Sequence, residues 1–398
     1  MLRELFMSLY SEGNVRYVGQ ASPLFKLAFV TGFLTLITAG IYRFWSKTRI
    51  RKYIWSSLKI DGDAFEYTGT GLEKLLGFLI AIVFLAVYLG IIQVVLTFLG
   101  VGFLSDPENE LIFLLSFYAS FFALVPFILF AIYRARRYKL ARTRFRGIRF
   151  AMENAAWGYA LRAMGHYLLT AISLGALLPR QTFYLEKFMT DRSFYGDARF
   201  EQGGRWTALY AAMKHVFIGL GIMVLGGVLA AVASPVMGVI IGVVGLLWLF
   251  IGFAYYRVHA FAYLANTKTL DGTVTFKASP RAGEIIKIVV LGSIAVALVG
   301  SVGFGILGGA LWGMTLNAGL SQSPSVLAII VTVLGYMSIF VALGALSLVM
   351  INQPVIAHLA GTLHVNNIEG LSSIRQRMTD KGADAEGFAD ALDIGGAI

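Results

Sequence analysis

Long apolar runs alternate along the chain with shorter stretches in which basic, aromatic and polar residues gather. Eight apolar runs stand out, at roughly 23–41, 72–104, 110–133, 160–178, 207–232, 236–262, 285–312 and 325–351. A helix of about 20 apolar residues crosses the hydrocarbon core of a bilayer, and most of these runs reach that length. The pattern predicts an all-α polytopic membrane protein.

Three connections between the runs contain no Lys or Arg, at 101–110, 230–237 and 312–324, although the chain holds 33 such residues. Loops rich in Lys and Arg stay in the cytoplasm, so these three turns are predicted outside and the bulk of the loops inside. The paired runs then form three hairpins, 72–133, 207–262 and 285–351, with about six spanning helices.

The runs 23–41 and 160–178 fit this scheme only as non-spanning segments. Basic loops lie on both sides of 160–178, and a single crossing would place one of them outside. Arg162 and His166 also suit a membrane boundary better than the bilayer centre. Both runs are therefore predicted to be re-entrant or interfacial. The alternative is eight spans, with the charge rule broken.

The two non-spanning runs resemble each other. Residues 34–40 read LTLITAG and residues 169–175 read LTAISLG, so that Gly40 and Gly175 are 135 positions apart. Gly62 and Gly196 are 134 apart. Agreeing offsets indicate an internal duplication. We therefore divide the chain into a first membrane repeat, 1–155, a second, 156–265, a third hairpin unit, 266–360, and a cytoplasmic tail, 361–398.

A short glycine motif recurs just ahead of several apolar runs. It centres on Gly62, Gly147, Gly196 and Gly272, each with an apolar residue two positions before and a phenylalanine soon after. Asp-Gly at the first and last of these sites favours a two-residue type I′ turn. Small cytoplasmic β-hairpins that pair with one another are expected, the alternative being plain loops that return to the membrane.

The stretch 33–79 carries four specific patterns, TxGIYxFW, a basic RxRxY run, DGxxFxYTGTG and ExLLGFL. In these it resembles the signature of the YjgN family of bacterial inner-membrane proteins, a family defined by a domain of unknown function. The acidic tail near 385–398 is also similar. The resemblance implies a multi-pass fold in the bacterial inner (cytoplasmic) membrane, and it supplies no activity or catalytic residue.

Composition agrees with a membrane protein. The chain is 58% hydrophobic and 14% charged, against about 25% charged in soluble domains. Its formal net charge of +11 is interpreted as an orientation signal and as attraction to anionic lipid headgroups. Nucleic-acid binding is not expected, and the sequence leaves association into a homo-oligomer open.

Motifs for catalysis are missing from the sequence. The chain has no cysteine, and its five histidines show no metal-ligand spacing. No phosphate-binding GxxxxGK[ST] loop and no GxSxG nucleophile elbow occur. We therefore expect no enzyme activity, no metal and no cofactor. His166 and His215 are the candidate intramembrane polar residues, either hydrogen-bonded between helices or acting as a proton relay or headgroup ligand.

Basic and aromatic residues interleave just after the first apolar run. The candidate lipid headgroup belt consists of Arg43, Trp45, Lys47, Arg49, Arg51 and Trp55. Aromatic rings at headgroup depth beside cations are typical of an interface anchor. The alternative makes these residues part of the scaffold, paired with nearby carboxylates.

Two functions are consistent with this sequence. Glycine-rich runs with Gly238-xxx-Gly242 and Gly305-xxx-Gly309 spacings, duplicated halves and re-entrant segments favour a transporter or channel-like protein for a small solute or lipid. The same glycines also suit plain helix packing. The charge asymmetry favours a non-transporting envelope factor that binds anionic lipid or a partner through its basic cytoplasmic face.

Overall fold

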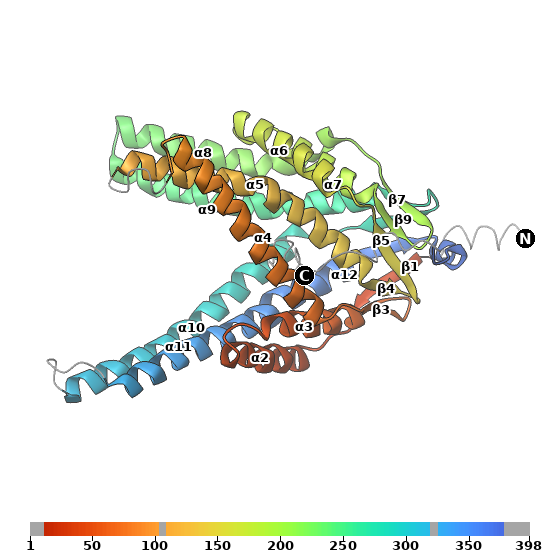
Figure 1. Cartoon of the computed structure of the whole chain (residues 1–398). Helices are drawn as coiled ribbons and strands as arrows, with labels where there is room; N and C mark the ends of the chain where they lie inside the picture. The colour runs from red at the N-terminus through yellow and green to blue at the C-terminus, as the bar shows by residue number, and fades with distance from the viewer. Residues whose placement is uncertain (1–11, 103–108, 319–324, 378–398) are drawn as a thin grey trace, which may run out of the picture. The chain divides into compact units, whose positions relative to one another are not determined.

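A single element order, strand–helix–helix–strand, is repeated five times within the residues that the computed structural model describes, 12–102, 109–318 and 325–377. Figure 1 shows the helical pairs as hairpins that begin and end at strands. The strands are β1 (Glu12–Tyr17), β2 (Leu58–Ile60), β3 (Asp63–Tyr67), β4 (Thr143–Phe145), β5 (Ile148–Met152), β6 (Ser193–Tyr195), β7 (Ala198–Gln202), β8 (Lys268–Leu270), β9 (Val274–Ala278) and β10 (Leu363–Asn366).

Between these strands lie five helical hairpins, three long and two short. The short ones are α2 (Ala21–Ile37) with α3 (Arg43–Ser57), and α6 (Ala156–Ile172) with α7 (Leu178–Thr190). The long ones are α4 (Gly71–Phe98) with α5 (Glu110–Ala141); η1 (Trp206–Met213) and α8 (Lys214–Val232) with α9 (Pro235–Asn266); and α10 (Ala282–Ala318) with α11 (Val326–Ser347), the π-turn η2 (Leu348–Asn352) and α12 (Gln353–Gly361). A last 3₁₀ turn, η3, covers Ile368–Ser373.

The three long hairpins confirm the prediction of six membrane-spanning helices. In the part of the chain described, six helices are long and apolar enough to cross a membrane. They also extend well beyond the 20 residues that the hydrocarbon requires; α5 and α9, for example, have 32 residues each. Each of the six is therefore longer than the hydrocarbon core alone requires.

The two short hairpins agree with the prediction of non-spanning segments. Helices α2 and α6 have 17 residues each, about 25 Å at 1.5 Å per residue, and each then reverses direction. The two turns share their geometry. Ala39 and Leu174 have φ of 48° and 49°, the following glycines have φ of 93° and 87°, and Gly40 and Gly175 each donate from N–H to a threonine carbonyl at 2.8 Å.

The ten strands pair antiparallel into a closed barrel, in the order β1-β10-β9-β8-β7-β6-β5-β4-β3-β2. The prediction of an all-α protein with small hairpins is therefore incomplete. The strands are only three to six residues long, so their alternation is a weak signal, and β1 pairs with β10 across almost the whole chain. One face of these strands is buried and mainly apolar. It includes Val15, Ile60, Phe145, Tyr195 and Leu270.

The glycine motifs are the turns of four hairpins within this barrel. Asp61 and Gly62 have positive φ and separate the paired residues Ile60 and Asp63, as the type I′ prediction requires. Arg146-Gly147 has the same form, whereas at the third turn only Gly196 has positive φ. The fourth loop differs from the prediction. Leu270 pairs with Val274, which leaves three residues in the loop, because Thr273 follows Asp271 and Gly272.

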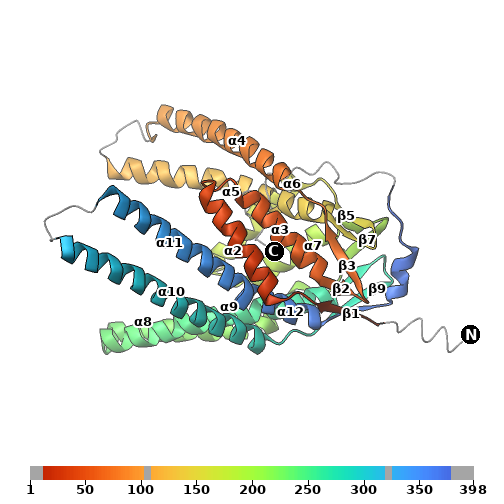
Figure 2. The same ribbon diagram turned by 90° about the horizontal axis from the view of Figure 1, so that it is seen from below.

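The chain forms two compact units, and neither is continuous in sequence. One consists of 1–64, 208–266 and 276–368, and the other of 65–207, 267–275 and 369–398. The first holds the α2–α3, α8–α9 and α10–α12 hairpins, with α2 packed on α11 (Figure 2). The second holds α4–α7, with a core formed by α5, α6 and α7. The sequence division at 155, 265 and 360 stays a prediction, although the predicted tail contributes β10.

Glycines let α8 and α9 pack with their backbones in close contact. A Cβ on Gly226 would lie 2.6 Å from the amide nitrogen of Gly242, and one on Gly245 would lie 2.7 Å from that of Met223. In this hairpin the small residues serve packing. Gly305 and Gly309 differ, because a Cβ at either position would meet nothing within 4 Å.

Candidate functional site

The candidate headgroup belt lies on α3, but its side chains do not share one face. Arg49 is exposed and stands over the ring of Tyr42, with 5.6 Å from its Cζ to the ring centroid. Arg51 is only 2% exposed and lies over Trp55 at 5.9 Å. Arg43, Trp45, Lys47 and Trp55 are half-buried. Of the four cations, therefore, Arg49 is the most accessible to solvent or lipid, and Arg51 belongs to the packed interior.

Cations stacked on aromatic rings also occur outside α3. Arg134 and Arg142 on the strand-side end of α5 stand over Phe130 and Tyr138, at 5.8 and 5.5 Å. Lys214, at the strand-side start of α8, lies 5.2 Å from the ring of Tyr255. Such pairs hold a cation beside an apolar surface while its outer face stays hydrated or bound to an anion. The basic–aromatic pattern noticed on α3 thus extends to both compact units.

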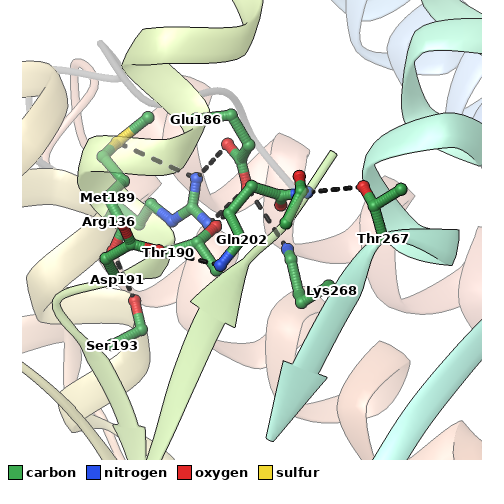
Figure 3. Close-up of polar contacts among 10 residues, drawn as sticks. Arg136, Glu186, Met189, Thr190, Asp191, Ser193, Gln202, Thr267 and Lys268 are labelled. Carbon is green, nitrogen blue, oxygen red and sulfur yellow. Dashed lines mark hydrogen bonds and ion pairs between the residues drawn. The ribbon is translucent and has the colours of Figure 1, made fainter. Parts of the chain in front are cut away.

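A polar cluster centred on Glu186 joins α5, α7 and β8 (Figure 3). Arg136 donates to both carboxylate oxygens of Glu186, from Nη1 at 2.6 Å and from Nη2 at 2.9 Å. Lys268 Nζ lies 3.3 Å from Oε1, and the Thr190 hydroxyl donates to the same oxygen at 3.0 Å. A bidentate Arg–carboxylate pair is a strong and directional contact. The cluster therefore fixes α7 against a membrane helix and a barrel strand.

The two flanking cations control the titration of the central carboxylate. Although burial alone would raise it, the pKa of Glu186 lies well below its ordinary value because of Arg136 and Lys268. Burial lowers the pKa of Lys268, and Glu186 opposes that change. Glu186 is consequently ionised at every physiological pH, which suits a structural ion cluster better than a general acid.

A shallow pocket of about 350 Å³ lies beside this cluster, lined by Lys187, Asp191, Arg199, Glu201, Gln202, Gly203, Thr267 and Thr269. Much of its polar lining is already engaged. Lys187 Nζ donates to the Gln202 carbonyl at 2.6 Å and pairs with Asp191 at 3.0 Å. Gln202 donates to the Thr267 hydroxyl at 2.8 Å (Figure 3). These contacts tie α7 to β7 and β8.

His166 lies in a second cluster, on the short α6–α7 hairpin. Its ring stacks on Tyr184, with the centroids 5.6 Å apart, and its Nδ1 lies 3.4 Å from Nη1 of Arg180. The Arg180 guanidinium in turn stands over the ring of Tyr184 at 5.4 Å. Burial, and secondarily the nearby Arg180 cation, lower the pKa of His166. At neutral pH the imidazole is therefore mainly uncharged, and Arg180 carries the charge of the cluster.

His215 occupies a different environment in the first turn of α8. Its ring contacts Tyr255 edge-on at 4.5 Å and Trp248 at 5.9 Å. Its Nδ1 is buried and has no hydrogen-bond partner among the residues that the structure describes. His166 and His215 thus lie in separate aromatic environments, one in each compact unit. Over the described ranges, no group of three or more His, Cys, Asp or Glu residues is arranged to hold a metal ion.

Sequence reasoning missed the Glu186 cluster and the partners of His166. Arg136, Glu186 and Lys268 are far apart along the chain, and each resembles an ordinary loop charge. One signal was available for Glu186. It is the first carboxylate after Glu153 in an otherwise apolar and basic segment, and such an isolated carboxylate requires partners when it is buried.

Comparisons with known proteins agree with one another. The family model described as "Bacterial protein of unknown function (DUF898)" matches residues 12–391. The curated relative "Inner membrane protein YjgN" of Salmonella typhimurium is 24% identical over 146 residues, or 36% of this chain. The match spans about a third of that relative's length, 33%. No solved structure matches the chain.

Proposed function

The chain belongs to the DUF898 family of bacterial proteins of unknown function, the YjgN family whose signature it resembles, and from that premise we propose that it is a non-transporting inner-membrane protein that binds anionic phospholipid. In this proposal the barrel and the basic ends of the helices face the cytoplasm. The six apolar helices hold the barrel at the bilayer surface, and the exposed cations contact lipid phosphates.

The observation that carries this proposal is the recurrence of cation–aromatic pairs. They occur on α3, at the strand-side start of α8 and on α7, at Arg49, Lys214 and Arg180. The Arg142 pair at the end of α5 is instead engaged by Glu73, at 3.0 Å. Aromatic residues prefer the bilayer interface, and each cation near an anionic leaflet contributes about 1 kcal/mol of attraction. In this proposal the cations and the aromatic rings lie at the cytoplasmic leaflet, which contains anionic lipid. The charge of the cations and the depth of the rings in the membrane then agree.

The transporter alternative receives less support from the helices. A transport path usually involves polar groups at the bilayer midplane and discontinuous helices. The sequence from 288 to 357 holds no charged residue, and the closest glycine contacts of α8 and α9 support packing. We therefore keep transport only as an outcome to be tested.

The proposal is tested by lipid retention. The purified protein is delipidated, incubated with equal amounts of phosphatidylglycerol and phosphatidylcholine, and analysed by native mass spectrometry. We expect preferential retention of phosphatidylglycerol that weakens at high salt, because the Debye length falls from about 10 Å at 0.1 M to about 3 Å at 1 M ionic strength. The variant Arg49→Gln/Lys52→Gln, which neutralises two exposed cations of α3, should lose several-fold in that preference.

Two results would decide against it. Equal retention of the two lipids at low salt would end the anionic-lipid proposal. Solute flux through proteoliposomes containing the purified protein, absent from empty liposomes, would favour the transporter instead.

A further inference from the structure

One face of α6 packs against α5 and α7 through alanines and Tyr159, whereas the opposite face of α6 and the tip of the α6–α7 hairpin expose large apolar side chains. Ala156, Ala160 and Ala163 are at most 2% exposed and pack in one cluster with Leu129 and Tyr133 of α5. The opposite face and the tip carry Leu168, Ile172 and Leu174, which are 62%, 71% and 90% exposed. An exposed apolar surface of this kind marks a contact with membrane or with another protein.

The charges of this hairpin favour an anionic membrane as the contact. From Ala156 to Leu185 the sequence holds two arginines, Arg162 and Arg180, and no carboxylate. Arg162 donates to the carbonyl of Gly158 at 3.0 Å and stands 4.8 Å from the ring of Phe188. For Arg180 the described residues provide an imidazole and an aromatic ring and no carboxylate. Its charge is therefore balanced by no acid of the hairpin.

The length of the α6–α7 hairpin is consistent with insertion of its tip into a single leaflet. His166 lies six residues before the end of α6 at Ile172, which is about 9 Å along the helix axis. An interfacial helix buries its apolar face by about 5–10 Å, and one leaflet contributes about half of the 30 Å hydrocarbon core. With the tip at Leu174 in the hydrocarbon, His166 and Arg180 would lie at the depth of the phosphates.

We propose that Arg180, His166 and Tyr184 form a phosphate site for one anionic phospholipid, which the α6–α7 hairpin reaches by dipping into a single leaflet. This inference rests on the anionic-lipid binding proposed above and adds a location to it. The guanidinium offers two parallel donors to a phosphate, while its face stays on the Tyr184 ring. A phosphate oxygen is a better acceptor for Nη1 than the 3.4 Å contact with the neutral imidazole.

The test compares lipid retention of Arg180→Gln with that of Arg16→Gln, which removes the same charge from an exposed position on β1. Native mass spectrometry with phosphatidylglycerol is the readout, and phosphatidylcholine is the reference lipid. Arg180→Gln should weaken phosphatidylglycerol retention by about five-fold, the ratio that one basic residue near an anionic surface supplies. Arg16→Gln should change it much less.

A measurement on the unmodified site keeps the proposal testable if Arg180→Gln does not fold. Histidine ring signals are recorded by NMR in nanodiscs of phosphatidylglycerol and of phosphatidylcholine, with His166 assigned from His166→Gln. We expect the His166 signal to differ between the two lipids more than those of the other four histidines. A spin label on Leu174→Cys should report oxygen-rich hydrocarbon and not water.

The outcomes separate this inference from the general proposal. Preferential binding of phosphatidylglycerol that Arg180→Gln leaves unchanged would overturn the site and leave lipid binding intact. No preference in the wild-type protein would overturn both. Displacement of the lipid by millimolar inorganic phosphate would assign the site to free phosphate, and a Leu174 label shielded by a second copy of the chain would assign the apolar face to an oligomer.

Discussion

At the residue scale, burial decides the role of each cation. Arg51 and Arg49 are two residues apart on α3, yet Arg51 is buried and Arg49 is exposed. The headgroup interpretation of the α3 belt therefore suits Arg49 better, whereas the scaffold alternative suits Arg51. Arg136 is neither exposed like Arg49 nor buried like Arg51. It forms an ion pair with Glu186, a carboxylate 50 residues away in the sequence.

The Glu186 cluster gives a prediction with a defined pH dependence. Glu186→Gln keeps the shape of the side chain and leaves Arg136 and Lys268 without their anion. It should destabilise the protein by about 1–3 kcal/mol, the cost of an unsatisfied charged partner. The lower part of that range is expected, since these side chains retain 22–31% exposure. Thermal unfolding of the detergent-solubilised protein is the measurement.

The difference in unfolding free energy between wild type and Glu186→Gln should have its largest value above about pH 4.5, the ordinary pKa of a glutamate in the unfolded chain. Below that pH the unfolded carboxyl binds a proton while the folded one, whose pKa is depressed, stays ionised. Proton binding then stabilises the unfolded state of the wild type, so its advantage in unfolding free energy over Glu186→Gln decreases as the pH falls. A difference in unfolding free energy that stays constant from pH 7 down to pH 3 would contradict this assignment.

At the element scale, close helix approach depends on which glycines face the partner helix. Gly226 and Gly227 are adjacent on α8. A Cβ on Gly226 would lie within 2.9 Å of backbone atoms of α9, whereas one on Gly227 would meet nothing within 4 Å. The two positions therefore form a matched pair for a single added methyl group.

Gly226→Ala should destabilise the α8–α9 hairpin by about 1–3 kcal/mol, the usual cost of an overpacked contact. Gly227→Ala should be neutral or slightly stabilising, because alanine is the better helix former. Unfolding of both variants in the same detergent measures the contrast. Equal stabilities would mean that α8 and α9 do not pack through this face in the membrane.

At the scale of the whole molecule, every helical hairpin begins and ends at a barrel strand. With the six long helices crossing the bilayer, we expect the strands on one side and the turns of the long hairpins on the other. Residues 103–108 and 319–324 of the predicted turns lie outside the described residues, but Ser234 lies in the turn between α8 and α9. Ser279 is exposed just after β9.

The chain has no cysteine, so single substitutions report the side of the membrane without background. An impermeant thiol reagent applied to intact spheroplasts should label Ser234→Cys and spare Ser279→Cys. Both should be labelled after lysis, which shows that both thiols are reachable. The reverse pattern would invert the proposed orientation and place the barrel outside the cytoplasm.

The sequence by itself determined the membrane class, the six long apolar helices, the two shorter apolar segments beside them, and the positive-φ turns at Gly62 and Gly272. These features follow from local properties, namely the length of apolar runs, the distribution of Lys and Arg, and Asp-Gly pairs with strict backbone demands. Only the tertiary structure decided that ten short strands close a barrel, that Glu186 joins Arg136 and Lys268, and that Arg51 is buried. The physical reason is that strand pairing and ion pairing act between residues far apart in sequence. A three-residue strand or a lone charge carries no local sign of its partner.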